Sequence, residues 1–231
     1  MTIQEYTKTL GINLTPEQIS AFGIYQKELM EWNEKFNLTA IKTPDEITLK
    51  HFVDSLTIIP HIPEESHTIV DVGSGAGFPG LAIKIARPDM KITLLESTGK
   101  KVTFLDHIIA TLKLPYAETI KIRAEEAGHN KKLREKFDVV TARAVAYLPV
   151  LAEYMLPLVK VGGICIAQKT HSESEVNDAR HAINILGGKI KEIIPITIPG
   201  LESHELVIIE KVFETENLYP RTTGIPTKDP L

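Results

Sequence analysis

The connection between the last two predicted strands is the strongest constraint on the fold. These strands cover residues 189–198 and 204–212, and about five residues around Pro199-Gly200 join them. A parallel pair would need a crossover connection of a dozen or more residues. The last strand must therefore run antiparallel to the strand before it.

Upstream of this pair, β-rich runs alternate with helical stretches. We predict strands at 68–72, 92–95, 119–122, 137–141 and 164–167, and helical stretches at 81–86, 101–112, 149–159 and 173–186. Such alternation is typical of a parallel sheet with helices on both faces. Six parallel strands with an antiparallel seventh make an α/β, seven-stranded Rossmann-like sheet. A plain dinucleotide-binding sheet lacks the reversed strand.

The first 66 residues show a helical pattern instead. Thr15-Pro16-Glu17-Gln18 is a capping box with proline at the first helical position, and Thr43-Pro44-Asp45-Glu46 repeats this start signal. Apolar residues follow each signal at helical spacing, and Pro60 stops the second helix. We expect three parts: an N-terminal helical extension at 1–66, a Rossmann-like domain at 67–213 and a basic C-terminal tail at 214–231.

Composition limits the class of protein. The 231 residues carry a net charge of −4 and contain no apolar run of about 18 residues, so we expect no membrane span. The first ten residues do not read as a signal peptide. The single cysteine, Cys165, rules out an internal disulfide and a zinc-type cysteine cluster. We expect a cytoplasmic monomer without a metal, and any RNA-binding surface must be local because the chain is acidic overall.

The segment from Asp71 to Gly80 is the strongest local signal. It reads Asp-Val-Gly-Ser-Gly-Ala-Gly-Phe-Pro-Gly, follows a strand and opens a helix. Its glycines, Gly73 and Gly75 among them, allow a tight turn and a close approach of a ligand to the backbone. Asp71 would repel a pyrophosphate but could face a cationic amino or sulfonium group, and Pro79 removes an N–H that a phosphate would bind. The loop therefore favours S-adenosylmethionine over a dinucleotide.

Three further strand ends lie at the same edge of the predicted sheet, where ligands of open α/β sheets bind. Glu96 has nearly the offset of about 20 residues expected of a ribose-binding acid. The backbone of Ala124 and Glu125 is placed to flank an adenine. Arg143 could bind a carboxylate or a substrate phosphate, or could pair with a nearby acid such as Glu125.

These residues and others match one known family. The matching segments are Asn37-Leu38-Thr39, Lys50-His51 with Asp54-Ser55-Leu56, the unbroken 71–80 loop, Glu96-Ser97 with Lys100-Lys101, Arg123-Ala124-Glu125, Ala142-Arg143-Ala144, and Tyr219-Pro220-Arg221 with Gly224, Pro226 and Lys228. Over nearly its whole length the chain resembles the small-subunit ribosomal RNA methyltransferase G family, also called glucose-inhibited division protein B.

The resemblance implies methyl transfer from S-adenosylmethionine to N7 of a guanine in the decoding-region stem-loop of small-subunit (16S) rRNA. The partner would be this rRNA or a ribosomal subunit precursor. For the cofactor, the resemblance implies contacts by Gly73, Phe78, Ala124, Glu125 and Arg143, and the loop and strand ends add Asp71, Gly75 and Glu96. As RNA-contacting residues we expect Asn37, Lys50, His51, Lys100, Arg143 and Arg221. Without the resemblance, a structural hydrogen bond between the N-terminal helices and the sheet is the better reading of His51 and Asp54.

Guanine N7 carries an exposed lone pair, so methylation there requires no catalytic base and we name no catalytic residue. Cys165 lies in an apolar run and is expected to be a buried strand residue, which disfavours a covalent cysteine mechanism. Other readings are a methyltransferase acting on a small molecule, as the charge of −4 would suit, or on another RNA position. An oxidoreductase using a nicotinamide cofactor and a binding module without catalysis fit the reversed strand, Asp71 and the intact glycines less well.

Overall fold

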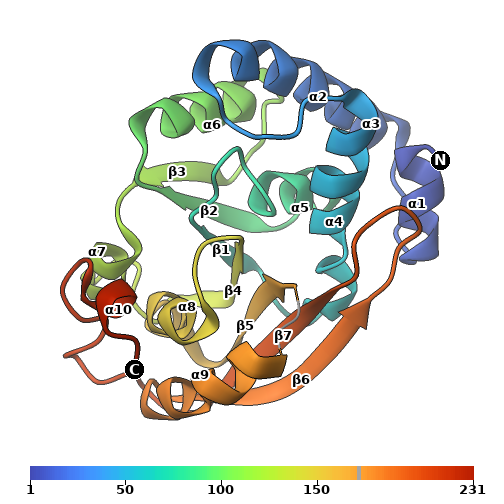
Figure 1. Cartoon of the computed structure of the whole chain (residues 1–231). Coiled ribbons are helices and arrows are strands. Elements are labelled where there is room, and N and C mark those ends of the chain that lie inside the picture. The colour runs from blue at the N-terminus through green and yellow to red at the C-terminus, as the bar shows by residue number, and fades with distance from the viewer. Residues whose placement is uncertain (171–172) are drawn as a thin grey trace.

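The computed structural model describes residues 1–170 and 173–231 and contains a seven-stranded sheet. Its strands are β1 (Thr68–Val72), β2 (Lys91–Glu96), β3 (Ala117–Lys121), β4 (Phe137–Arg143), β5 (Val159–Lys169), β6 (Gly188–Ile196) and β7 (His204–Lys211), in the spatial order β3-β2-β1-β4-β5-β7-β6. The predicted Rossmann-like sheet is confirmed (Figure 1).

The reversed strand lies inside the sheet and not at its edge. β7 pairs antiparallel with β6 and also with β5, so β6 runs in the same direction as β1 to β5. A strand with neighbours on both sides and helices over the sheet should be apolar on both faces. Leu206, Val207, Ile208 and Ile209 are all buried, as that position requires. The carboxyl end of β6 and the start of β7 therefore meet at the edge where β1 to β5 end.

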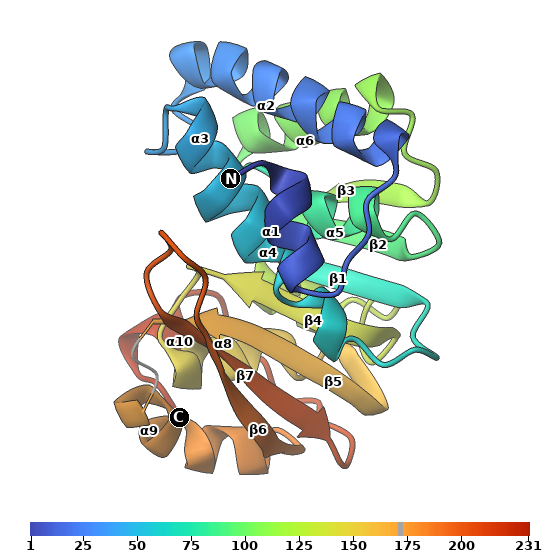
Figure 2. The ribbon, with the colours of Figure 1, turned by 90° about the vertical axis from the view of Figure 1, so that its right-hand side faces the viewer.

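Helices cover both faces of the sheet (Figure 2). One face carries α1 (Ile3–Thr9), α2 (Pro16–Phe36), α5 (Gly80–Ala86) and α6 (Gly99–Thr111), and the other carries α7 (Ala124–His129), α8 (Leu148–Met155), α9 (Glu173–Ile185) and α10 (Ile225–Lys228). Phe22 and Tyr25 of α2 belong to the same buried cluster as Leu94 of β2 and Phe104 of α6. The N-terminal helices thus share their core with the sheet. In the described part of the chain, no helix has the length and apolarity needed to cross a bilayer.

The second N-terminal helix is not the continuous α-helix that the sequence predicts. It divides into α3 (Pro44–Glu46), a π-helix over Ile47–Val53 and α4 (Asp54–Leu56), and a short 3-10 turn over Ile59–His61 follows. Isolated π-helical turns are rare and occur often at functional sites. Here the π-helix carries buried His51 and leads directly into Asp54, and both side chains reach the sheet.

The predicted helix 149–159 is too long, and the strand after it begins earlier than predicted. α8 ends at Met155, and Val159 already pairs with Phe137 of β4. Between Val159 and the apolar run of β5 lies Gly163, where a Cβ atom would meet the Asp138 carbonyl oxygen at 2.6 Å. This close approach requires glycine, and the Gly162-Gly163 pair separates the start of the strand from its apolar run in the sequence.

The C-terminal segment 214–231 lies against α7 and α8, where α10 is seen in Figure 1. It carries Glu214, Glu216 and Asp229 against Arg221 and Lys228, three acids against two bases. The expectation of a basic tail is therefore wrong.

Candidate active site

A cavity of about 640 Å³ lies at the carboxyl ends of β1, β2 and β3. Its lining residues are Val72, Gly73, Leu95, Glu96, Ser97, Ile122, Arg123, Ala124, Glu125, Val145, Ala146, Tyr147, Val150, Tyr154, Thr223, Gly224, Thr227 and Pro230. This volume is typical of a site for a small molecule or cofactor. Gly73, Glu96, Ala124 and Glu125, all predicted to contact the cofactor, are among these residues. Below we call it the cofactor cavity.

The glycine loop is fixed between the sheet and helix α2. The backbone N–H groups of Gly73 and Ser74 both donate to the Leu95 carbonyl, over N···O distances of 2.9 and 3.0 Å. The buried hydroxyl of Tyr25 donates to the Ala76 carbonyl from α2. Gly73 has a φ of +70°, and a Cβ there would lie 2.8 Å from Cγ2 of Val145. The loop therefore needs glycine at this position for both its conformation and its closeness to Val145.

Glu96 combines burial with unused acceptor capacity. Its side chain is 5% exposed, its Oε2 accepts from Gly75 N–H at 3.0 Å and its Oε1 accepts from Thr98 N–H at 2.7 Å. A carboxylate oxygen has two lone pairs, so each oxygen can accept one more hydrogen bond. The residue thus fits the predicted role of holding two ribose hydroxyls at the cavity wall. Gly75 itself does not line the cavity and contributes through Glu96.

Asp71 does not line the cofactor cavity. It is fully buried, its Oδ2 accepts from Gly80 N–H at 2.9 Å, and its Oδ1 has no hydrogen-bond partner in the structure. Burial raises the pKa of Asp71 to about 7, although the Gly80 hydrogen bond acts in the opposite direction. The carboxyl occupies the start of α5, where a dinucleotide fold would place its pyrophosphate. Its contact with the cofactor stays a prediction.

The Asp71→Asn variant tests this environment. Because the pKa of Asp71 in the folded state lies above its ordinary value of 3.8, its stabilising contribution is complete below about pH 4 and is lost as the pH rises through about 7. Asparagine keeps an acceptor for Gly80 but does not titrate. The free energy of unfolding of the variant relative to the parent should therefore increase between about pH 4 and about pH 7, by a few kcal/mol. Urea unfolding at fixed ionic strength measures this, and a difference that does not change with pH would contradict the raised pKa.

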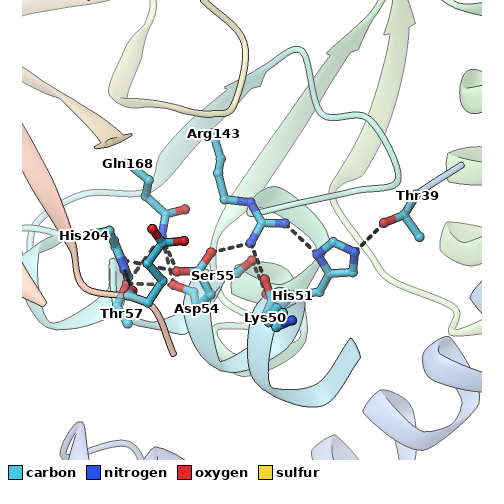
Figure 3. A network of polar contacts seen from close by, with 10 residues as sticks. Thr39, Lys50, His51, Asp54, Ser55, Thr57, Arg143, Gln168 and His204 are labelled. Atoms are coloured by element: carbon cyan, nitrogen blue, oxygen red, sulfur yellow. Dashed lines mark hydrogen bonds and ion pairs between the residues drawn. The ribbon is translucent and has the colours of Figure 1, made fainter. Parts of the chain in front are cut away.

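A second polar group of residues surrounds Arg143, at the end of β4 (Figure 3). The guanidinium donates to Oδ2 of Asp54, to the Lys50 carbonyl at 3.0 Å and to Nδ1 of His51 at 3.1 Å. The guanidinium carbon also lies 5.2 Å from the centre of the Phe78 ring. The sequence suggested Glu125 as a possible ion-pair partner; the partner is Asp54 instead, because the N-terminal helices bring it to this strand end.

These contacts determine the protonation of His51. Arginine can only donate, so Nδ1 of His51 must accept, and the proton on Nε2 is donated to the Thr39 hydroxyl at 2.8 Å. Burial, with the charge of Arg143 beside it, lowers the pKa of His51 to about 3. The imidazole is therefore neutral near pH 7, with both nitrogens engaged.

Asp54 extends the network to the next two strands. Gln168 of β5 donates from Nε2 to the Asp54 carbonyl at 2.9 Å, and Nε2 of His204 in β7 lies 3.2 Å from Asp54 Oδ1 without hydrogen-bond geometry. His51 and Asp54 thus attach the N-terminal helices to the ends of β4, β5 and β7. This is the structural role that the sequence left open for them.

This network borders a second cavity of about 360 Å³, which we call the substrate cavity. Its lining residues are Lys50, Asp54, Arg143, Ala144, Gln168, Lys169, Thr170, Leu201, Glu202 and His204. Ala144 lines the substrate cavity and the next residue, Val145, lines the cofactor cavity. The loop after β4 therefore lies between the two cavities.

Three other residues predicted to contact the cofactor or the RNA, Phe78, Asn37 and Lys100, line neither cavity. Phe78 is buried and stacks on the rings of Tyr25 and His51, at centroid distances of 5.4 and 4.3 Å. Asn37 caps the end of α2 in a left-handed conformation, and Lys100 donates to the neighbouring Phe36 carbonyl. Of the expected RNA-contacting residues, Lys50, His51 and Arg143 come together around the Arg143 guanidinium, and Lys100 reaches the end of α2 beside Asn37.

Arg221, the last of the six residues expected to contact RNA, lies in the C-terminal segment on the face of the sheet that α8 covers. There it pairs with Glu153 of α8. Sequence reasoning missed Gln168 and His204 of the substrate cavity, and Thr223 and Thr227 of the cofactor cavity. Gln168 and His204 lie at strand ends of the binding edge, which was a usable signal.

Comparison with known proteins identifies the family. The family described as rRNA small subunit methyltransferase G matches residues 18–201. Ribosomal RNA small subunit methyltransferase G of Acetivibrio thermocellus is 47% identical over 96% of this chain and 92% of its own, and that of Lactobacillus johnsonii is 45% identical over 96% and 95%.

Among solved structures, a SAM-dependent methyltransferase from Aquifex aeolicus aligns with a TM-score of 0.57 at 14% identity, over 76% of this chain and 97% of its own. M. jannaschii TYW2 in complex with AdoMet aligns with a TM-score of 0.54 at 15% identity, over 70% and 76%. These two support the fold alone. The sequence matches, which span nearly the whole chain, show that this protein belongs to the rRNA small subunit methyltransferase G family of S-adenosylmethionine-dependent methyltransferases.

Proposed function

We propose that this chain methylates N7 of a guanine in the decoding-region stem-loop of 16S rRNA, with S-adenosylmethionine as the methyl donor. Membership of the rRNA small subunit methyltransferase G family supports the reaction class and the small-subunit rRNA substrate. The observation that carries the proposal is the pair of cavities on either side of the loop after β4. A donor in one and a base in the other would meet across this loop.

The residues of the cofactor cavity fit the proposed donor. S-adenosylmethionine supplies a methyl group on a positively charged sulfur. The lining carries Glu96 and Glu125 against one cation, Arg123, a balance that suits a cationic ligand and not a pyrophosphate. Ile122 and Val150 offer apolar walls for an adenine. Each carboxylate oxygen of Glu96 can accept one more hydrogen bond, from a ribose hydroxyl.

Neither His51 nor Cys165 suits a mechanism that needs a general base or a covalent adduct. His51 is a poor general base because its pKa is about 3 and Arg143 already holds its Nδ1. Burial raises the pKa of the Cys165 thiol to about 12, so a covalent cysteine adduct is disfavoured. Guanine N7 presents its lone pair directly. The task of the protein is then to align the base and to exclude water.

We propose that RNA reaches the substrate cavity along the side formed by residues 1–66. Lys50 lies at the cavity, and Asn37 and Lys100 meet at the end of α2. Basic side chains there would contact phosphates, and binding would weaken as salt is added. The acceptor would be rRNA or a subunit precursor, the protein would act as a monomer, and the cytoplasm is the expected location because ribosomal subunits mature there.

The direct test is to map methylated guanines in 16S rRNA from cells with and without this protein. We expect one 7-methylguanine of the decoding-region stem-loop to be absent without the protein and restored by the parent gene. Purified protein should also transfer labelled methyl groups from S-adenosylmethionine to subunits or rRNA from the deletion strain. The acidic net charge favours a small-molecule acceptor as second candidate. Unchanged rRNA methylation in the deletion strain would reject the rRNA proposal.

A further inference from the structure

The C-terminal tail, residues 214–231, forms part of the cofactor cavity. Thr223, Gly224, Thr227 and Pro230 line it, together with the ends of β1, β2 and β3 from much earlier in the chain. Figure 1 shows α10 beside α7 and α8. The cavity is therefore incomplete unless the tail is docked.

One guanidinium holds the start of the tail. Arg134 donates from Nη1 to the carbonyls of Gly128 and Tyr219, at 2.7 and 2.8 Å, and from Nη2 to those of Thr215 and Glu216, at 2.6 and 3.1 Å. Three of these four acceptors belong to the tail. Arg134 does not line the cavity, so any effect it has on a ligand there must act through the tail.

A buried ion pair holds the middle of the tail. Glu153 of α8 is fully buried, and its carboxylate accepts from the Arg221 backbone N–H at 2.6 Å, from Nε at 3.0 Å and from Nη2 at 2.8 Å. Moving the tail away would leave this carboxylate without the cation and the N–H donors that compensate its burial. The ion pair therefore favours the docked position, and the charge of Arg221 is already used within the chain.

The tail also contacts a residue expected to bind the cofactor. Gly224 N–H donates to Oε1 of Glu125 at 3.0 Å, and the Thr227 and Tyr154 hydroxyls lie 3.1 Å apart. The Tyr154 hydroxyl in turn donates to Glu125 at 3.4 Å. The side chain of Glu125 is thus oriented by the tail and by α8 together.

We propose that docking of the tail and binding of the cofactor are coupled, with Arg134 as the positioning residue that holds the tail as a wall of the cofactor cavity. The proposal rests on the proposed function, since it takes S-adenosylmethionine and its product as the ligands. A ligand that touches the docked tail binds the docked state more tightly, so the ligand must stabilise docking and loss of docking must weaken the ligand.

The test compares Arg134→Met with Arg180→Met, which makes the same change at an exposed arginine of α9 that does not line the cofactor cavity. Isothermal titration with S-adenosylhomocysteine should give a dissociation constant about ten-fold weaker for Arg134→Met and unchanged for Arg180→Met. In methyl-transfer assays the KM for S-adenosylmethionine should rise with little change in kcat. Equal affinity of both variants and the parent would overturn the coupling.

A second measurement needs only the parent protein. Hydrogen exchange of backbone amides in residues 219–231 should slow when S-adenosylhomocysteine is added, because the ligand favours the docked tail. Binding to the parent without slower exchange in the tail would overturn this inference and leave the proposed function standing. A parent that does not bind S-adenosylhomocysteine at all would overturn both.

Discussion

The Gly73→Asp variant is expected to fold but to lose binding of S-adenosylhomocysteine by about a hundred-fold or more. Three effects act together at this position. The φ of +70° disfavours any side chain, a Cβ would lie 2.8 Å from Val145, and the new carboxylate would enter a cavity that already carries Glu96 and Glu125. Strain alone costs about 1–2 kcal/mol, so most of the loss should come from blocking the cavity.

The matched control is Gly162→Asp. Gly162 also has a positive φ, +83°, but a Cβ there meets nothing within 4 Å, and it lies at the opposite end of the sheet from the cavities. Gly162→Asp should lose in urea unfolding only the stability that the backbone strain costs, whereas Gly73→Asp should lose more stability and should also lose the ligand in isothermal titration. Equal ligand affinity in the two variants would place the cofactor elsewhere.

The Arg143→Met variant should lower the free energy of unfolding by about 3–5 kcal/mol and reduce methyl transfer at least ten-fold. Methionine fills similar space but leaves the Asp54 carboxylate, whose side chain is 12% exposed, without its cation. It also frees the Lys50 carbonyl and His51 Nδ1. Because these groups border the substrate cavity, its shape should change as well. Urea unfolding and initial rates measure the two effects.

Two further variants separate charge from shape. Arg87→Met removes an arginine from an exposed pair with Asp89 and should cost less than about 1 kcal/mol. Adding Asp54→Asn to Arg143→Met removes the buried charge, so part of the lost stability should return while activity stays low. If the double variant is as unstable as the sum of the single variants, the ion pair is not the source of the loss.

Much of the fold could be predicted because the pattern is local. β1 has the predicted bounds, and the short link at Pro199-Gly200 required a reversed last strand. The insertion of β7 between β5 and β6 could not be predicted. The short turn requires β7 to pair with β6, but it does not determine which strand pairs with the other edge of β7. The π-helix at Ile47–Val53 was equally hidden, because its apolar residues recur much as in an α-helix.

Some residues of the candidate site could likewise be predicted from the sequence, and others could not. Gly73, Glu96, Ala124 and Glu125 follow from the rule that ligands bind at strand ends, and all four line the cofactor cavity. The partner of Arg143 did not follow, because Asp54 lies 89 positions earlier in the chain and only tertiary packing brings it there. The pairing of Arg221 with Glu153 of α8 could not be predicted for the same reason, and Arg221 was expected to contact RNA instead.

On the proposed function, the turn between β6 and β7 would be a place where base preference can change without disturbing the methyl donor. Each strand from β1 to β5 is followed by a helix that returns the chain to the opposite end of the sheet. β6 is instead followed by a short turn that leads directly into β7. Residues Leu201 and Glu202 of this turn border the substrate cavity, and no residue of the turn borders the cofactor cavity. Exchange of this short turn between relatives is therefore the natural starting point for redirecting the enzyme to a different nucleotide.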